Sequence, residues 1–144
     1  RAHIDTPYRF EDFARSTNDE LFGVQIIVPL DRFTIENGAT CILPGSHASR
    51  FYYKDIEENQ EEYNDLLTTE GFQFVSNSGD ALIYNSRTLH STMPNKSDEF
   101  RSAMLINALD VNLIERIREI DVSNKTARFD NKSQKTWQND KSGI

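Results

Sequence analysis

The chain has 144 residues, of which 37% are hydrophobic and 27% charged, and its formal net charge is −7. This length predicts a single domain, and the acidic balance argues against a nucleic acid or an anionic membrane as a partner. No apolar run is long enough to span a membrane, and the single cysteine, Cys41, excludes an intrachain disulfide. A lone cysteine fits a reducing compartment, so we expect a cytoplasmic protein, with a targeting segment upstream left open.

Most of the predicted elements are short strands separated by turn signals. Runs rich in β-branched and aromatic residues predict strands over residues 21–30, 40–43, 71–80, 81–90 and 100–109, with one more around His3. The Asn37-Gly38 dipeptide and the Ser-Gly-Asp run at 78–80 mark turns between strands. This pattern predicts a mainly β fold, a sandwich or jelly roll with a few peripheral helices. About six strands are too few for a closed eight-stranded jelly roll, so we expect the N-terminal part of the fold to lie outside this sequence.

Two segments show the periodicity of amphipathic helices. The first spans residues 54–67, and the second spans residues 110–120 behind a candidate N-cap, Asp110. Residues 121–144 are polar, and we expect them to form an irregular tail. The expected organisation is therefore the C-terminal two-thirds of a jelly-roll domain over residues 1–120, followed by this tail.

Three residues have the types and the spacing of a metal site. His3 and Asp5 are separated by one residue, so on an extended segment their side chains point to the same face, roughly 7 Å apart along the strand. His90 comes from a distant predicted strand. Two imidazoles and one carboxylate on one side of an ion form the facial triad of non-haem Fe(II) oxygenases. His47, in the Pro-Gly-Ser-His run, is an alternative ligand that we interpret instead as a turn residue.

Residues 79–106 add a candidate binding site for a carboxylate. His90 ends one predicted strand and Arg101 opens the next, with a polar turn between them. If the two strands pair as a hairpin, Arg101 returns to the neighbourhood of His90, where a guanidinium can hold a carboxylate through two parallel hydrogen bonds. A dicarboxylate cosubstrate could then chelate the metal at one end and bind the arginine at the other. The alternative for this arginine is a salt bridge to Asp98 or Glu99.

Three blocks of the sequence resemble one known family. They are HIDTPY, DRFTIENGATCILPGSH and GDALIYNSRTLHSTMPNKSDEFR, in that order along residues 1–110. They resemble the phytanoyl-CoA dioxygenase-like family of Fe(II)/2-oxoglutarate-dependent oxygenases. The resemblance implies a double-stranded β-helix, the cupin-like form of the jelly roll. Members of that family carry a substantial region before the His-x-Asp motif, so we expect part of the fold to precede Arg1.

The resemblance also implies site residues, carried over position by position. The iron ligands of the family correspond to His3, Asp5 and His90. The arginine that binds the far carboxylate of 2-oxoglutarate lies eleven residues beyond the distal histidine, where this chain has Arg101. Thr92, two residues beyond that histidine, corresponds to a hydroxyl residue that assists. We add Gln25 as a candidate cosubstrate contact, because a strand residue upstream of the Glu-Asn-Gly block has that role in relatives.

The activity that follows is oxidation of a small molecule with Fe(II), 2-oxoglutarate and O2, releasing succinate and CO2. Relatives that halogenate replace the carboxylate ligand by a small residue, so Asp5 favours hydroxylation. Desaturation and ring formation stay open, and neither the substrate nor the oligomeric state can be read from the residues. Two alternatives remain: a jelly-roll metal-binding module without turnover, and a cupin-like metalloenzyme that does not use 2-oxoglutarate.

Overall fold

The computed structural model describes residues 1–5, 7–8, 14, 21–113 and 115. The strands in this part of the chain are β1 (Gly23–Pro29), β2 (Thr40–Ile42), β3 (Phe72–Gln73), β4 (Leu82–Asn85), β5 (His90–Thr92) and β6 (Ala103–Leu109). The helices are a 3-10 turn (Ser46–Ala48), α2 (Tyr53–Glu58) and α3 (Gln60–Glu70). None of the helices so described is both long and apolar enough to cross a membrane.

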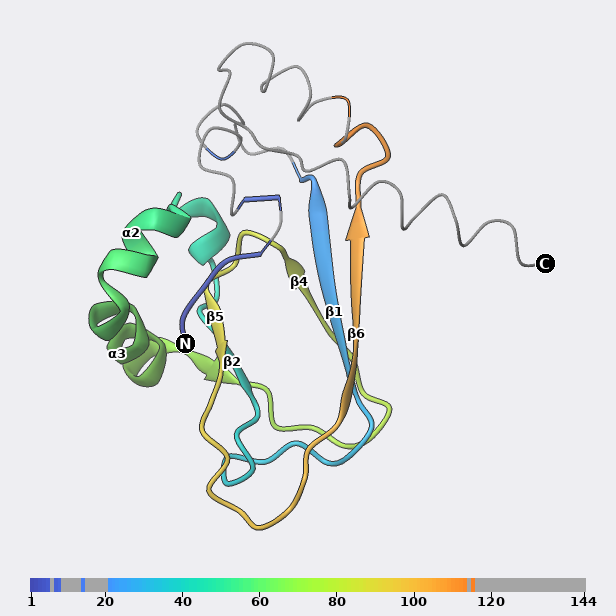
Figure 1. Cartoon of the computed structure of the whole chain (residues 1–144). Coiled ribbons are helices and arrows are strands. Elements are labelled where there is room, and N and C mark those ends of the chain that lie inside the picture. Colours follow the sequence, from blue (N-terminus) through green and yellow to red (C-terminus); the bar gives the residue numbers. More distant parts are fainter. Residues whose placement is uncertain (6, 9–13, 15–20, 114, 116–144) are drawn as a thin grey trace, which may run out of the picture.

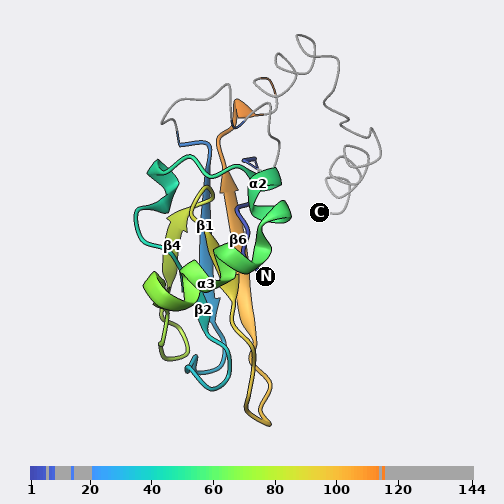
Figure 2. The same ribbon diagram turned by 90° about the vertical axis from the view of Figure 1, so that its left-hand side faces the viewer.

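The strands form two antiparallel sheets of three strands, in the orders β4-β1-β6 and β3-β2-β5. The two sheets face each other, and α2 and α3 lie on the side of β2 and β5 that is away from the other sheet (Figure 1). The view turned by 90° shows the same helices in front of the strands (Figure 2). The mainly β architecture with a few peripheral helices agrees with the sequence-based prediction.

The predicted strand over residues 81–90 is divided into two strands that belong to different sheets. The side chain of Asn85 accepts a hydrogen bond from the backbone N–H of Arg87, and the N–H of Thr88 donates to the carbonyl of Asn85. This local turn carries the chain from β4 to β5, because an asparagine side chain can replace a ladder partner for nearby backbone groups. The prediction that His90 ends a strand was therefore wrong: it begins β5.

Two other predicted elements also differ from the structure. The helix expected over residues 54–67 is interrupted at Asn59, whose backbone leaves the helical region with φ −119° and ψ 43°. The strand expected over residues 71–80 reduces to Phe72–Gln73 and one isolated bridge between Phe33 and Ser76. The second predicted helix beyond residue 115 and the tail over residues 121–144 lie outside the described residues.

The larger core lies between the sheet β3-β2-β5 and the helices, and it includes both neighbours of His3. Ala2 is 1% exposed and Ile4 is fully buried, and they pack in one cluster with Ile56 of α2 and Leu67 of α3. Side chains alternate along an extended segment, so burial of Ala2 and Ile4 turns His3 and Asp5 to the opposite face. A smaller cluster, which includes Ile27, Phe33, Ala39 and Tyr84, lies between the two sheets.

We expect Gly38→Ala to destabilise the protein more than Gly45→Ala. Both glycines have positive φ, +76° and +80°, so alanine costs about 1–2 kcal/mol at either position for the left-handed backbone alone. A Cβ at Gly38 would also collide with the carbonyl oxygen of Met93, whereas a Cβ at Gly45 meets nothing within 4 Å. Urea unfolding of the two variants measures the difference, and equal losses of unfolding free energy would contradict it.

Candidate metal centre

Backbone hydrogen bonds hold the segment that carries His3 and Asp5. The N–H of His3 donates to the carbonyl of His90 at 3.0 Å, and the N–H of His90 donates back to the carbonyl of His3 at 3.0 Å. Two residues further on, the N–H of Asp5 donates to the carbonyl of Ser86 at 2.8 Å. The short segment is therefore attached at both candidate ligand positions to the stretch that contains the third.

The side chains of His3, Asp5 and His90 converge on one point. Each offers one ligand atom, and the three atoms lie within 4.8 Å of one another. The Nε2 atom of His90 is 3.2 Å from one carboxylate oxygen of Asp5, and the Nε2 atom of His3 is 3.8 Å from the other. The two imidazole rings lie 4.2 Å apart between centroids. No other group of three such residues gathers in this way among the described residues.

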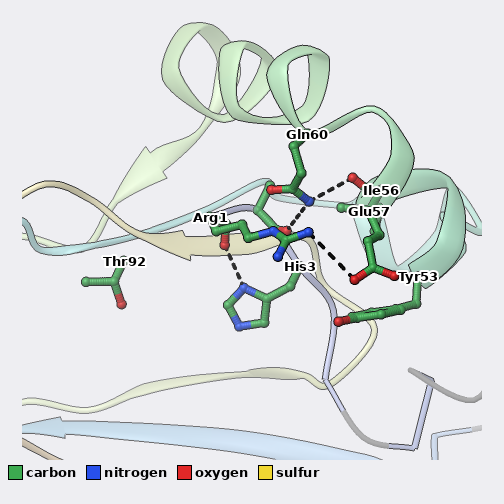
Figure 3. A pocket seen from close by; sticks show the side chains of 8 residues that line it. Arg1, His3, Tyr53, Ile56, Glu57, Gln60 and Thr92 are labelled. Atoms are coloured by element: carbon green, nitrogen blue, oxygen red, sulfur yellow. Dashed lines mark hydrogen bonds and ion pairs between the residues drawn. The ribbon is translucent and has the colours of Figure 1, made fainter.

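The hydrogen bonds of the two imidazoles determine which ring nitrogen carries a proton. The Nδ1 atom of His3 lies 2.8 Å from the carbonyl oxygen of Arg1 (Figure 3), and the Nδ1 atom of His90 lies 2.9 Å from the carbonyl oxygen of Thr88. A carbonyl can only accept, so both Nδ1 atoms donate. In the neutral rings each Nε2 then presents a lone pair toward the carboxylate of Asp5. Three electron-rich groups that face one another can hold a cation between them, and this donor set suits a divalent transition metal.

Burial and a neighbouring imidazole disfavour the protonated form of His3. Desolvation is the largest cause that lowers the pKa of this histidine, and repulsion from His90 adds to it. The carbonyl of Arg1 and the carboxylate of Asp5 act in the opposite direction and do not overcome it. The ring is therefore biased toward the neutral form, which is the form that ligates a metal.

A cavity of about 350 Å³ opens from the metal-ligand cluster between the two sheets. Its volume falls in the range typical of small-molecule sites. The six residues predicted from the sequence all line it: His3, Asp5, Gln25, His90, Thr92 and Arg101. Gln25 faces the cavity from β1, and Thr92 from β5. The structure thus brings every predicted site residue into one space.

Arg101 reaches this cavity, but not through the predicted hairpin. β6 pairs with β1, and β5 pairs with β2, so the two strands on either side of Arg101 belong to opposite sheets. The connecting loop crosses from one sheet to the other at the bottom of Figure 1. The prediction that Arg101 and His90 are near neighbours in a strand pair was therefore wrong. They border one cavity because the two sheets face each other across it.

The guanidinium of Arg101 lies 4.3 Å above the ring of Phe33, a contact that holds it in place at the cavity wall. Burial lowers the pKa of Arg101 from its ordinary value, although arginine stays charged in proteins. No carboxylate among the described residues forms an ion pair with it, so the alternative salt bridge to Asp98 or Glu99 is absent. A half-buried cation that no carboxylate in the described part of the chain neutralises is suited to bind an anionic ligand.

Two polar cavity residues were not found from the sequence, Tyr84 on β4 and Thr40 on β2, and neither were the apolar lining residues Ile27, Ala103 and Leu105. The ring of Tyr84 lies edge-on to His90 with centroids 5.0 Å apart, and burial together with the charge of Asp5 raises the pKa of its phenol. The signal lies in the strand register: Tyr84 is opposite Gln25, and Thr40 is opposite Thr92. Strand pairs opposite a predicted site residue share its face, so correct pairing would have identified both residues.

The remaining candidates lie elsewhere. His47 is exposed in the 3-10 turn and does not belong to the cluster of ligands. Cys41 is 3% exposed, and its thiol donates to the carbonyl of Leu67 at 3.4 Å, so it is a buried, hydrogen-bonded side chain. A second hollow, of about 330 Å³, borders His3 and Thr92 on the side of α2 and α3 (Figure 3).

The fold and the cluster together define a class of protein, a jelly roll with a candidate site for one metal ion between its sheets. Comparison with protein families agrees: the family model described as phytanoyl-CoA dioxygenase (PhyH) matches residues 1–103. The chain belongs to the phytanoyl-CoA dioxygenase family. The resemblance inferred from the three sequence blocks is confirmed.

The chain also matches individual relatives, each over only part of the relative's length. Dioxygenase cdmD of Talaromyces verruculosus is 31% identical over 112 residues, which cover 73% of this chain and 32% of that protein. The probable alpha-ketoglutarate-dependent hypophosphite dioxygenase of Stutzerimonas stutzeri is 31% identical over 103 residues, 65% of this chain and 35% of that protein. The crystal structure of EvdMO1 has a TM-score of 0.50 and 24% identity over 62% of this chain and 20% of its own, which shows a shared fold. This chain spans about a third of the length of these two curated relatives.

In the metal-free protein we expect the imidazole of His3 to titrate below the ordinary pKa of about 6.5. Above that pH neither state binds the proton, whereas between 6.5 and the lowered pKa only the unfolded chain does, so the free energy of unfolding falls as the pH drops through this window. NMR titration of the ring protons measures the pKa. Asp5→Asn should lower it further and His90→Gln should raise it, because the carboxylate favours the imidazolium and the second histidine opposes it. Shifts of the opposite signs would contradict this account.

Proposed function

We propose that the protein is an Fe(II)/2-oxoglutarate-dependent dioxygenase that hydroxylates a C–H bond of a small molecule. The observation that carries this proposal is the cavity with a cluster of two histidines and an aspartate. The same walls hold an arginine that pairs with no carboxylate of the described residues. Membership of the phytanoyl-CoA dioxygenase family supports it. So do the names of two relatives, both dioxygenases, one of which is called alpha-ketoglutarate-dependent.

The proposed ligands of Fe(II) are the Nε2 atoms of His3 and His90 and the carboxylate of Asp5. Together with 2-oxoglutarate and O2, the bound iron supplies the oxidising chemistry, with succinate and CO2 as coproducts. The protein arranges the three donors before the metal arrives, because the carbonyls of Arg1 and Thr88 already select the tautomer with free Nε2 atoms. These three residues would hold the metal from one side and would leave room on the cavity side for the cosubstrate and O2.

The remaining cavity residues orient the cosubstrate. Arg101 binds its far carboxylate, and the Phe33 ring beneath the guanidinium restricts the directions from which that carboxylate can approach. Thr92 and Gln25 supply a hydroxyl and an amide at opposite walls of the cavity, one from each sheet. The metal cluster carries one formal negative charge and Arg101 one positive charge, so a metal-chelating dicarboxylate is complementary to the cavity once a divalent cation is bound.

Asp5 supports hydroxylation as the outcome, because the halogenating relatives lack a carboxylate at this position. The acidic balance and the lone cysteine support a cytoplasmic enzyme that acts on a small molecule rather than on nucleic acid or a membrane surface. Measuring succinate release with a panel of small metabolites would identify the substrate.

Anaerobic addition of Fe(II) and 2-oxoglutarate should give a weak visible charge-transfer band, the signature of a 2-oxo acid chelated to ferrous iron. Asp5→Ala should abolish or alter this band, because it removes the only anionic ligand of the cluster. Asp65→Ala, which removes an exposed carboxylate on α3, is the matched control and should leave the band unchanged. A chain that shows no band, or the same band in Asp5→Ala, would not be the enzyme proposed here.

Arg101→Leu should weaken binding of 2-oxoglutarate strongly while leaving metal affinity and the binding of 2-oxobutyrate unchanged. The reason is that 2-oxobutyrate keeps the chelating end of the cosubstrate and lacks the far carboxylate. Losing a charge-assisted pair in a half-buried site corresponds to about 1.5–3 kcal/mol, or roughly 10- to 150-fold in the dissociation constant. Arg32→Leu, at an exposed arginine, is the control. Calorimetry with the Mn(II)-loaded protein makes the measurement, and an equal effect on both ligands would favour a metalloenzyme that does not use 2-oxoglutarate.

A further inference from the structure

The segment that carries His3 has a sheet on one side and two amide side chains on the other. The N–H of Ala2 donates to the Oδ1 atom of Asn64 at 2.9 Å, and the carbonyl of Ala2 accepts from the Nε2 atom of Gln60 at 3.0 Å. Figure 3 shows the bond from Gln60 beside His3. Both side chains come from α3 and are four residues apart, so they project from the same face of that helix. Together they bind both polar backbone groups of one residue.

This arrangement follows from the alternation of backbone groups in an extended segment. The N–H and carbonyl of His3 point to β5, so those of Ala2 point to the opposite edge. At an open edge these groups would need water or another strand. The two amides replace that strand, and their partners settle their orientation: a backbone N–H requires the oxygen of Asn64, and a carbonyl requires the nitrogen of Gln60.

The pair also lies where a small displacement would reach the metal ligands. Ala2 is the residue between His3 and Arg1, and the carbonyl of Arg1 accepts the bond from Nδ1 of His3. Gln60 is itself held by a second hydrogen bond, from its Nε2 atom to the carbonyl of Ile56 at 2.7 Å. A backbone shift at Ala2 would therefore move the Cα of His3 and the carbonyl that selects its tautomer together. Mutation of groups that orient a metal ligand through hydrogen bonds typically weakens metal affinity by about 10- to 100-fold.

We propose that Gln60 and Asn64 form an amide clamp, a pair of positioning residues that holds His3 in register for metal binding. The clamp rests on the proposed function, because its effect is expressed through the metal site. The helix α3, in the connection between β2 and β3, thus packs beside the segment that carries His3. Its two amides take the place of the hydrogen bonds that a neighbouring strand would form.

The first test replaces each amide by an apolar side chain of similar size. Asn64→Leu removes the bond to the N–H of Ala2, whereas Gln60→Met removes the bonds to the carbonyls of Ala2 and Ile56. Asn64→Leu and Gln60→Met should each weaken Mn(II) binding by about tenfold, measured by calorimetry. In the metal-free protein the amide proton of Ala2 should exchange faster in Asn64→Leu, measured by NMR. Glu61→Gln, at an exposed position of the same helix, is the control and should change neither quantity. Unchanged Mn(II) affinity in both variants overturns the proposal.

The second test separates hydrogen bonding from charge and from loss of structure. Asn64→Asp keeps the acceptor for the N–H of Ala2, so Mn(II) affinity should equal or exceed that of the wild type. Gln60→Glu places an acceptor against the carbonyl of Ala2 and should weaken binding by about tenfold, although it adds the same charge. Equal responses of the two acids overturn the clamp. If the wild type binds no Mn(II), the proposed function fails instead, while the exchange rate of the Ala2 amide still tests the hydrogen bond.

Discussion

The reciprocal backbone pair between His3 and His90 is the interaction on which the site depends. It joins two segments far apart in the sequence and sets two imidazoles side by side. The alternation of side chains along the extended segment then places Asp5 on the same face, and the hydrogen bond from the N–H of Asp5 to the carbonyl of Ser86 maintains the register. A slip by one residue would turn Ile4 into the cavity and bury the ligands among apolar side chains, so the apolar core and the metal site enforce one register together.

The electrostatics of the cavity follow from this pairing. The cluster gathers one carboxylate and two lone pairs, while Arg101 contributes a cation that none of the described carboxylates neutralises. Each charge alone is costly at a half-buried position, and together they are complementary to a divalent metal and an anion. Tyr84 adds a phenol whose pKa burial raises, so it stays a neutral hydrogen-bond donor next to the cluster. The cavity is thus arranged for a ligand that carries its own negative charge.

Local signals in the sequence were sufficient for the parts of the site that depend on short spacing. The His-x-Asp pair required only the period of a strand, and the glycine of Asn37-Gly38 indeed adopts positive φ. The approach of Arg101 was anticipated for the wrong reason, since hydrophobic runs do not show where a buried turn such as that after Asn85 divides a strand. Tyr84 stayed hidden because strand partners are set by the packing of two sheets, which no local pattern encodes.

The helical connection between β2 and β3 is an example of contacts between distant parts of the sequence that position the site. Its apolar face packs on Ala2, and its amides Gln60 and Asn64 bind the backbone of that same residue, so one helix pair supplies both the core and the edge of the ligand segment. The hollow beside α2 borders His3 as well. Changes in these helices therefore act on the same short segment that carries two of the candidate metal ligands. The effect reaches His3 through the two hydrogen bonds that Asn64 and Gln60 form with the backbone of Ala2.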